Sequence, residues 1–121
     1  MLLVKEGQIL ISNVNSSKIE GHLEIYHKNR WGTISQNGFN FAAAKVACRQ
    51  LGYAAVINYG IQYGSGLGHV WLTSINCLGT EVELTNCSIP KWGSIYNFHS
   101  WDVGVSCHNG NYNKNFYSVF E

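Results

Sequence analysis

Four cysteines, Cys48, Cys77, Cys87 and Cys107, constrain this 121-residue chain more than any other feature. A short chain with four cysteines forms either two disulfides, in one of three connectivities, or a metal site. A structural zinc site normally takes its ligands in close pairs, because a tight knuckle positions two at once. No Cys-x-x-Cys pair occurs, and no closely spaced histidine pair stands near the cysteines. The spacing favours structural disulfides, with an intracellular zinc domain as the alternative.

Size and charge narrow the class of protein further. The chain has room for one domain. With 45% hydrophobic and 12% charged residues it is too apolar for disorder, and a formal net charge of +1 gives no long-range attraction to nucleic acid. No apolar run approaches the roughly 20 residues that span a bilayer, and the start, MLLVKEGQILIS, is too charged for a secretory signal. We therefore expect neither nucleic-acid binding nor direct membrane insertion, in a chain that is either intracellular or part of a secreted protein.

Alternating hydrophobicity predicts short strands. Ile9 and Ile11, and then Leu23 and Ile25, alternate with polar residues, which is the period of half-buried strands. Further strands are predicted within 30–38, 70–77 and 101–107. Residues 53–70 are rich in glycine and aromatic residues and predict a long loop with room for one strand, whereas 79–87 predict a turn and a short helical or irregular piece.

One helix is predicted over residues 40–53, NFAAAKVACRQLGY. Asn40 can cap its start, and Gly52 stands where a left-handed residue would end it. Lys45 and Arg49 are expected to reach solvent beside the apolar face. Four residues at helical spacing are predicted to share that face, which directs the cysteine among them toward the core: Phe41, Ala44, Cys48 and Leu51. Several short strands around one helix predict an α+β domain.

Four segments, in order and in register, resemble a scavenger receptor cysteine-rich (SRCR) domain from about Gln8 to Cys107. They are EGHLEIYHKNRWGTI, AKVACRQLGY, GSGLGHVWLTSINCLGTEVELTNC and WDVGVSC. The resemblance is to the group A type, with only four cysteines. It implies a small curved antiparallel sheet that cradles one α-helix. It also implies an N-terminal extension at 1–7, the SRCR-like domain at 8–108, and a C-terminal tail or linker at 109–121.

The resemblance also implies the cysteine pairing. Cys48 would bond Cys107, joining the helix to the last strand, and Cys77 would bond Cys87, closing a small loop. Six-cysteine members of the family have a further bridge, and Ser35 and Asn97 occupy its positions here. Both cysteines are missing together, which leaves no unpaired thiol. A hydrogen bond between Ser35 and Asn97 is a partial substitute, at roughly 1 kcal/mol.

A calcium site is the first functional feature that the resemblance suggests. Many members bind calcium through two aspartates and a glutamate, whose positions here are Gln36, Asn37 and Glu81. Thr73 and Ser74 likewise stand where an Asp-Asp pair would. Calcium needs several oxygen ligands with enough negative charge to offset its dehydration. One carboxylate among neutral groups makes a degenerate site, so we expect no cofactor, with calcium as the alternative.

Two further kinds of surface site are candidates. Family members often recognise polyanions, and five basic residues are candidates for such contacts, although scattered solvated charges are the favoured interpretation: Lys28, Arg30, Lys45, Arg49 and Lys91. Two sequons match N-glycosylation, at Asn15 and at Asn86. Asn86 is the less favoured of the two, because its sequon contains Cys87.

No catalytic arrangement is recognisable. The five histidines are scattered, and GSGLGH lacks the third glycine of a dinucleotide loop. We therefore expect no enzyme in this chain, and we read Asp102 as a structural aspartate. The expected function is an extracellular ligand-binding module of a scavenger-type receptor or of a secreted defence or adhesion protein. It would recognise a protein or a polyanionic, glycan or microbial surface. The alternative is a non-catalytic accessory domain of a larger secreted enzyme, such as a protease or an oxidase.

Overall fold

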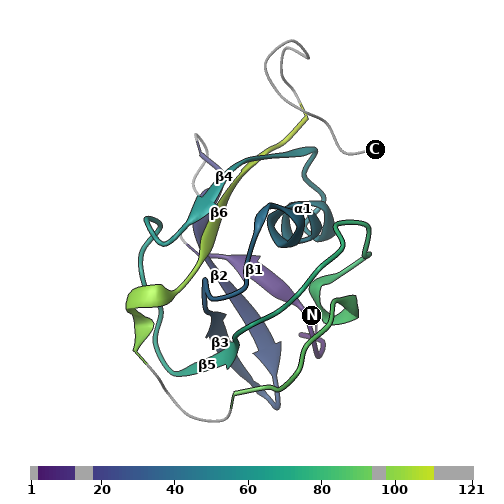
Figure 1. Ribbon diagram of the computed structural model, residues 1–121. Helices are drawn as coiled ribbons and strands as arrows, with labels where there is room; N and C mark the ends of the chain where they lie inside the picture. Colours follow the sequence, from purple (N-terminus) through teal and green to yellow (C-terminus); the bar gives the residue numbers. More distant parts are fainter. Residues whose placement is uncertain (1–2, 13–17, 94–97, 111–121) are drawn as a thin grey trace.

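The computed structural model describes residues 3–12, 18–93 and 98–110, and Figure 1 shows one helix against a curled sheet. The strands are β1 (Ile9–Ile11), β2 (Glu20–His27), β3 (Arg30–Ile34), β4 (Ala55–Gly60), β5 (His69–Leu72) and β6 (Gly104–His108). The α-helix is α1 (Phe41–Gln50), and the short 3₁₀ helices are η1 (Leu84–Asn86) and η2 (His99–Trp101). The α+β fold expected from the sequence is confirmed.

The sheet has the order β4-β6-β2-β3-β5, with β1 paired to β2 beside this path. Every pair is antiparallel except β3 and β5, which run parallel, so the sheet is mixed rather than purely antiparallel. The predicted alternation is confirmed, because Ile9, Ile11, Leu23 and Ile25 are all buried. The glycine-rich stretch after the helix contains the one strand for which it was expected to have room, β4, which pairs along β6.

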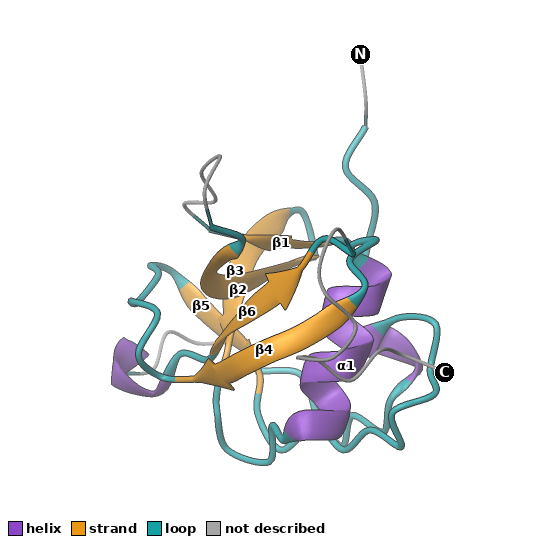
Figure 2. Cartoon of the chain, turned by 90° about the horizontal axis from the view of Figure 1, so that it is seen from above, coloured by secondary structure: helices purple, strands orange, loops and turns teal. Residues whose placement is uncertain are grey.

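Helix α1 starts and ends where its capping residues stand. The Asn40 carboxamide oxygen accepts the Ala43 amide at 3.0 Å. At the other end Gly52 adopts a φ of 88°, and its amide donates to the carbonyl of Arg49 at 2.9 Å. The helix lies alongside β4 and β6 (Figure 2). Its buried residues are Ala43, Ala44, Val46, Ala47 and Cys48.

Phe41 does not lie on the buried face of α1, contrary to the sequence prediction. Its side chain is 49% exposed, and the Lys45 ammonium nitrogen lies 5.9 Å from the centroid of its ring. The small alanines centre the packed face on Ala47, which leaves Phe41 on the flank of the helix.

The two disulfides pair as the resemblance implied. Cys48 bonds Cys107 and joins α1 to β6, while Cys77 bonds Cys87 and closes the loop that contains η1. All four cysteines are bonded, so none is left to bind zinc. Glu81 lies close to Cys77 and Cys87, but both sulfur atoms belong to a disulfide.

Three sequence predictions depend on residues at or beyond the limits of the described segments. Asn97 lies outside the described residues, so its pairing with Ser35 stays a prediction. Before β1, the Gly7 amide donates to the carbonyl of Tyr26 at 2.8 Å, which places this residue against β2. The boundaries predicted at residues 8 and 108 also stay predictions. Within the described residues, none of the helices combines the length and the apolar character needed to cross a bilayer.

Candidate functional site

A pocket opens where β3 and β5 end. These strands are parallel neighbours, so their carboxyl ends meet at one edge of the sheet, and η2 covers that edge from the side. The pocket has a volume of ≈ 490 Å³. Its lining residues are Ser35, Gln36, Asn37, Gly38, Thr73 and Trp101. A smaller cavity of ≈ 230 Å³ adjoins it and adds Val70 and Phe98 while sharing Ser35, Thr73 and Trp101.

Backbone hydrogen bonds hold the walls of this pocket together. The Gln36 amide donates to the carbonyl of Trp101 at 2.7 Å, and the Ser74 amide donates to the carbonyl of Asn37 at 2.8 Å. The Asn37 side-chain nitrogen donates to the hydroxyls of Ser74 at 3.2 Å and Thr73 at 3.4 Å. In contrast, the Gln36 side-chain oxygen is buried and has no hydrogen-bond partner. The Gln36 oxygen is therefore an unsatisfied acceptor in the wall of the pocket, out of contact with solvent.

Glu81 does not line this pocket. Its two carboxylate oxygens accept the amides of Leu78 at 2.8 Å and Gly79 at 2.9 Å, inside the loop closed by Cys77 and Cys87. The hydrogen bond from the Leu78 amide is the main reason that the pKa of Glu81 lies below its ordinary value. Its carboxylate is thus engaged in shaping its own loop. Of the three residues suggested as calcium ligands, the pocket brings together Gln36 and Asn37, and Thr73 from the replaced Asp-Asp pair also lines it.

The five basic candidates fall into two groups. Lys45 and Arg49 lie on α1, and Arg49 donates from one guanidinium nitrogen to the carbonyls of Gly79 at 2.8 Å and Glu81 at 2.7 Å. Arg49 was expected to reach solvent, but it has these partners because the disulfide loop folds over that side of the helix. The other group is at the β2–β3 turn.

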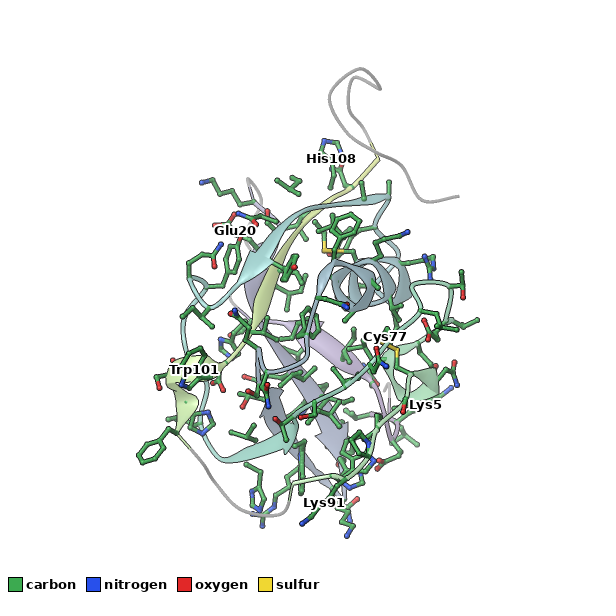
Figure 3. All side chains as sticks on the ribbon, viewed as in Figure 1. Lys5, Glu20, Cys77, Lys91, Trp101 and His108 are labelled. Atoms are coloured by element: carbon green, nitrogen blue, oxygen red, sulfur yellow. A yellow bond between two sulfur atoms is a disulfide. The ribbon has the colours of Figure 1, made fainter. Side chains whose placement is uncertain are left out.

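At that turn, Lys28 and Arg30 are exposed, and Lys91 is exposed beside Trp92. The Trp92 ring stacks on His27 with ring centroids 3.9 Å apart, which brings Lys91 to the same end of the sheet. Figure 3 shows Lys91 at the lower end of the molecule, away from α1. Three of the five basic residues therefore share one surface, next to the carboxylate of Glu6, which pairs with His27.

His99 and Asp102, on either side of Trp101 in the sequence, form a partly buried histidine–aspartate pair that sequence reasoning did not connect. Asp102 is only 2% exposed, and one of its oxygens accepts the Gly66 amide at 2.8 Å and contacts Nδ1 of His99 at 2.8 Å. His99 Nε2 lies 2.9 Å from the carbonyl oxygen of Gly68. Because a carboxylate and a carbonyl only accept hydrogen bonds, these contacts favour the doubly protonated ring, in keeping with the raised pKa of His99. The available signal was a histidine three residues before an aspartate that shortly precedes the last strand.

This pair anchors the loop between β4 and β5. A side chain at Gly66 would place its Cβ 2.6 Å from Thr33 Cγ2 and 3.0 Å from His22 Nε2, so only glycine fits there. His22 in turn pairs with Glu24 at 2.6 Å. Two histidine–carboxylate pairs therefore lie near one glycine, and the pair made by His99 and Asp102 bonds directly to the loop.

The stability of the domain is expected to fall as the pH rises above about 6.5, because His99 then loses its proton. Burial of the ring works against protonation, yet the hydrogen bonds to Asp102 and Gly68 and the charge of Asp102 outweigh it and raise the pKa of His99. A pKa raised by folding contributes stability that is complete below the unfolded value and is lost through the folded value. Urea unfolding across this pH range measures the effect.

His99→Gln should flatten this pH dependence, since glutamine does not titrate. His108→Gln, at the partly exposed end of β6, is the matched control for the replacement of a histidine outside this pair. A stability that rises with pH above 6.5, or a slope that His99→Gln does not alter, would contradict the assignment.

The two glycosylation candidates differ in what the structure shows. Asn86 is exposed at the end of η1, directly before Cys87, whose sulfur is bonded to Cys77. Asn15 lies outside the described residues. Both sites stay predictions.

Comparison with known proteins places these features in a family. A sequence model of the scavenger receptor cysteine-rich domain matches residues 13–108. Human lysyl oxidase homolog 4 is 44% identical over 91 residues, which cover 74% of this chain and 12% of that protein. The mouse macrophage scavenger receptor types I and II is 40% identical over 90 residues, covering 73% of this chain and 20% of that protein. The chain thus spans a small part of the length of these relatives.

Two solved structures share the fold. The SRCR domain of mouse MARCO, crystallised in a dimeric form, superimposes with a TM-score of 0.66 at 37% identity, covering 78% of this chain and 92% of that one. The third SRCR domain of murine neurotrypsin gives a TM-score of 0.69 at 33% identity, covering 83% of this chain and 94% of that one. With its one helix on a curled sheet and its two disulfides, this chain belongs to the scavenger receptor cysteine-rich domain family.

Proposed function

We propose that this chain is a non-catalytic accessory module of a larger secreted protein of the lysyl oxidase homolog type. The observation that carries the proposal is the combination of 44% identity to lysyl oxidase homolog 4 with coverage of only 12% of that protein. A module of this kind would hold its neighbour in place or bind a partner, and the chemistry of the parent would belong to another part of it.

The covalent framework supports an extracellular place for the module. Two disulfides in a small domain are typical of secreted and extracellular proteins, because thiols stay reduced in the cytosol. The bonds also make the domain a rigid support for its loops. Leu78 and Val82, both exposed in the loop closed by Cys77 and Cys87, would then contact a neighbouring domain or a partner.

A second candidate is a ligand-recognition module of a scavenger-type receptor or adhesion protein. It is favoured by 40% identity to the macrophage scavenger receptor and by the cationic surface formed by Lys28, Arg30 and Lys91. That surface would attract a polyanionic ligand in a way that salt screens, since its charges are exposed. The carboxylate of Glu6 beside it opposes this attraction.

The parent protein decides between the two candidates. Antibodies against this chain should capture the native protein from secretions or membrane extracts, and peptide mass spectrometry should then identify the rest of the captured chain. We expect peptides of an oxidase domain in a protein far larger than 13.5 kDa. A receptor stalk in place of the oxidase would favour the second candidate, and a native protein that ends at this domain would overturn both.

A further inference from the structure

We infer that the pocket where β3 and β5 end binds a neutral saccharide. This goes beyond the proposed function, because it names a ligand that the module would hold whatever its parent protein is. The inference rests on three features of the pocket, namely the charge of its lining, an unpaired buried acceptor, and two exposed aromatic rings at its edge.

The lining is polar but carries no formal charge. It presents the side-chain amides of Gln36 and Asn37 and the hydroxyls of Ser35 and Thr73. Together these groups offer hydrogen-bond donors and acceptors. A metal cation prefers carboxylates, and a phosphate or sulfate prefers arginine or lysine, and neither kind of residue is among those that line the two cavities. A ligand with several uncharged hydroxyl groups matches this lining.

One lining group lacks the partner that such a ligand supplies. The side-chain oxygen of Gln36 is buried without a hydrogen bond, an uncommon and costly state for an amide oxygen. The neighbouring Asn37 nitrogen makes only long bonds, of 3.2 Å to Ser74 and 3.4 Å to Thr73. Rotation of the Gln36 side chain toward the pocket would let a ligand hydroxyl donate to this oxygen and accept from the Asn37 nitrogen, which gives both amides a better partner.

Aromatic rings complete the site. Trp101 is 59% exposed and Phe98 is 88% exposed, although large aromatic side chains are usually buried in a domain of this kind. Trp101 lines both cavities and therefore lies between the polar pocket and Phe98. Figure 3 shows Trp101 at the edge of the molecule, where a ligand has access to it. The apolar C–H face of a sugar ring packs on such a surface, because the negative face of the indole attracts C–H groups.

The size of the site is suitable for a short saccharide. The main pocket, at ≈ 490 Å³, lies within the range of roughly 300–1,000 Å³ that small-molecule sites occupy. Because the pocket is open and its contacts are few, we expect roughly millimolar dissociation constants for a single sugar unit.

The test is a titration of the oxidised chain with each probe, in which two-dimensional NMR of the N–H groups reports binding. The probes are methyl α-mannoside, methyl β-galactoside, N-acetylglucosamine and a chitin trisaccharide, with calcium chloride and a heparin oligosaccharide as charged comparisons. We expect at least one neutral sugar to shift the side-chain signals of Gln36, Asn37 and Trp101 in a saturable manner. Failure of all four neutral probes, or tighter binding of a charged probe at these signals, would overturn the inference.

Variants locate the binding and distinguish it from unfolding. Trp101→Ala should weaken sugar binding at least about tenfold. Trp101→Phe should retain most of the affinity of the unaltered chain, because phenylalanine keeps an aromatic ring at the site. Phe98→Ala changes an exposed residue and should weaken binding without disturbing the fold. Phe41→Ala, an exposed ring on α1 outside the lining, is the matched control. Equal sugar affinity in Trp101→Ala, Phe98→Ala and the unaltered chain would overturn the site, whichever parent protein is identified.

Discussion

Replacing Cys48 and Cys107 together by alanine is expected to lower the free energy of unfolding by roughly 4 kcal/mol. The bond joins residues 59 apart, so it removes much of the freedom of the unfolded chain. Domains of this size are stable by only about 5–15 kcal/mol. Cys48 is also fully buried, and alanine there leaves part of its volume empty beneath α1. The variant should therefore be close to unfolding at physiological temperature.

The double variant Cys77→Ala with Cys87→Ala is the matched comparison. Its bond spans only 10 residues, for which the same chain-entropy relation gives roughly 3 kcal/mol. Urea unfolding followed by tryptophan fluorescence, with the remaining disulfide kept oxidised, measures both variants. A larger loss for the short loop than for the long one would contradict this ranking and would assign the main stabilisation to the folded loop around η1.

Asp102→Ala is expected to cost roughly 3 kcal/mol at pH 6. Removal of this carboxylate leaves the His99 imidazolium without its counter-ion and the Gly66 amide without its acceptor. Asp102→Asn should lose less, because its amide oxygen still accepts one hydrogen bond. At higher pH the cost of Asp102→Ala should shrink, since His99 then sheds its charge.

Glu24→Gln is the matched control, because it neutralises the carboxylate of the neighbouring pair with His22. That carboxylate is partly exposed, so its loss should cost at most about 1 kcal/mol. Urea unfolding gives the stability, and hydrogen exchange at the Gly66 amide reports whether the loop between β4 and β5 is released. Equal losses for Asp102→Ala and Glu24→Gln, with slow exchange at Gly66 in both, would show that the aspartate does not anchor this loop.

The pocket owes its character to the positions where this chain departs from the family pattern. Ser35 stands where six-cysteine members have a disulfide, and its hydroxyl lines the pocket. Gln36 and Asn37 stand where many members have calcium-binding aspartates, and they line the same pocket. These three positions thus lie together with the exposed ring of Trp101. The replacement of aspartates expected to bind calcium therefore also supplies the uncharged polar lining on which the proposed saccharide site rests.

The sequence by itself determined the local elements and the covalent framework. The alternation of Leu23 and Ile25 predicts β2, because successive side chains of a strand point to opposite faces. Asn40 and Gly52 bracket α1 because capping is an interaction between near neighbours. The family motifs added the cysteine pairing. Each of these features depends on a few consecutive residues or on a motif that is read directly.

Only the tertiary structure decided which distant residues share a site. Glu81 was grouped with Gln36 and Asn37, but its oxygens are bound by the amides of its own loop. Trp101 was not predicted to line a site, and it meets Gln36 because Ser35 and Asp102 form an antiparallel bridge and the Gln36 amide donates to the Trp101 carbonyl. Such proximities arise from the pairing of strands far apart in the chain, and side-chain spacing along the sequence carries no information about that pairing.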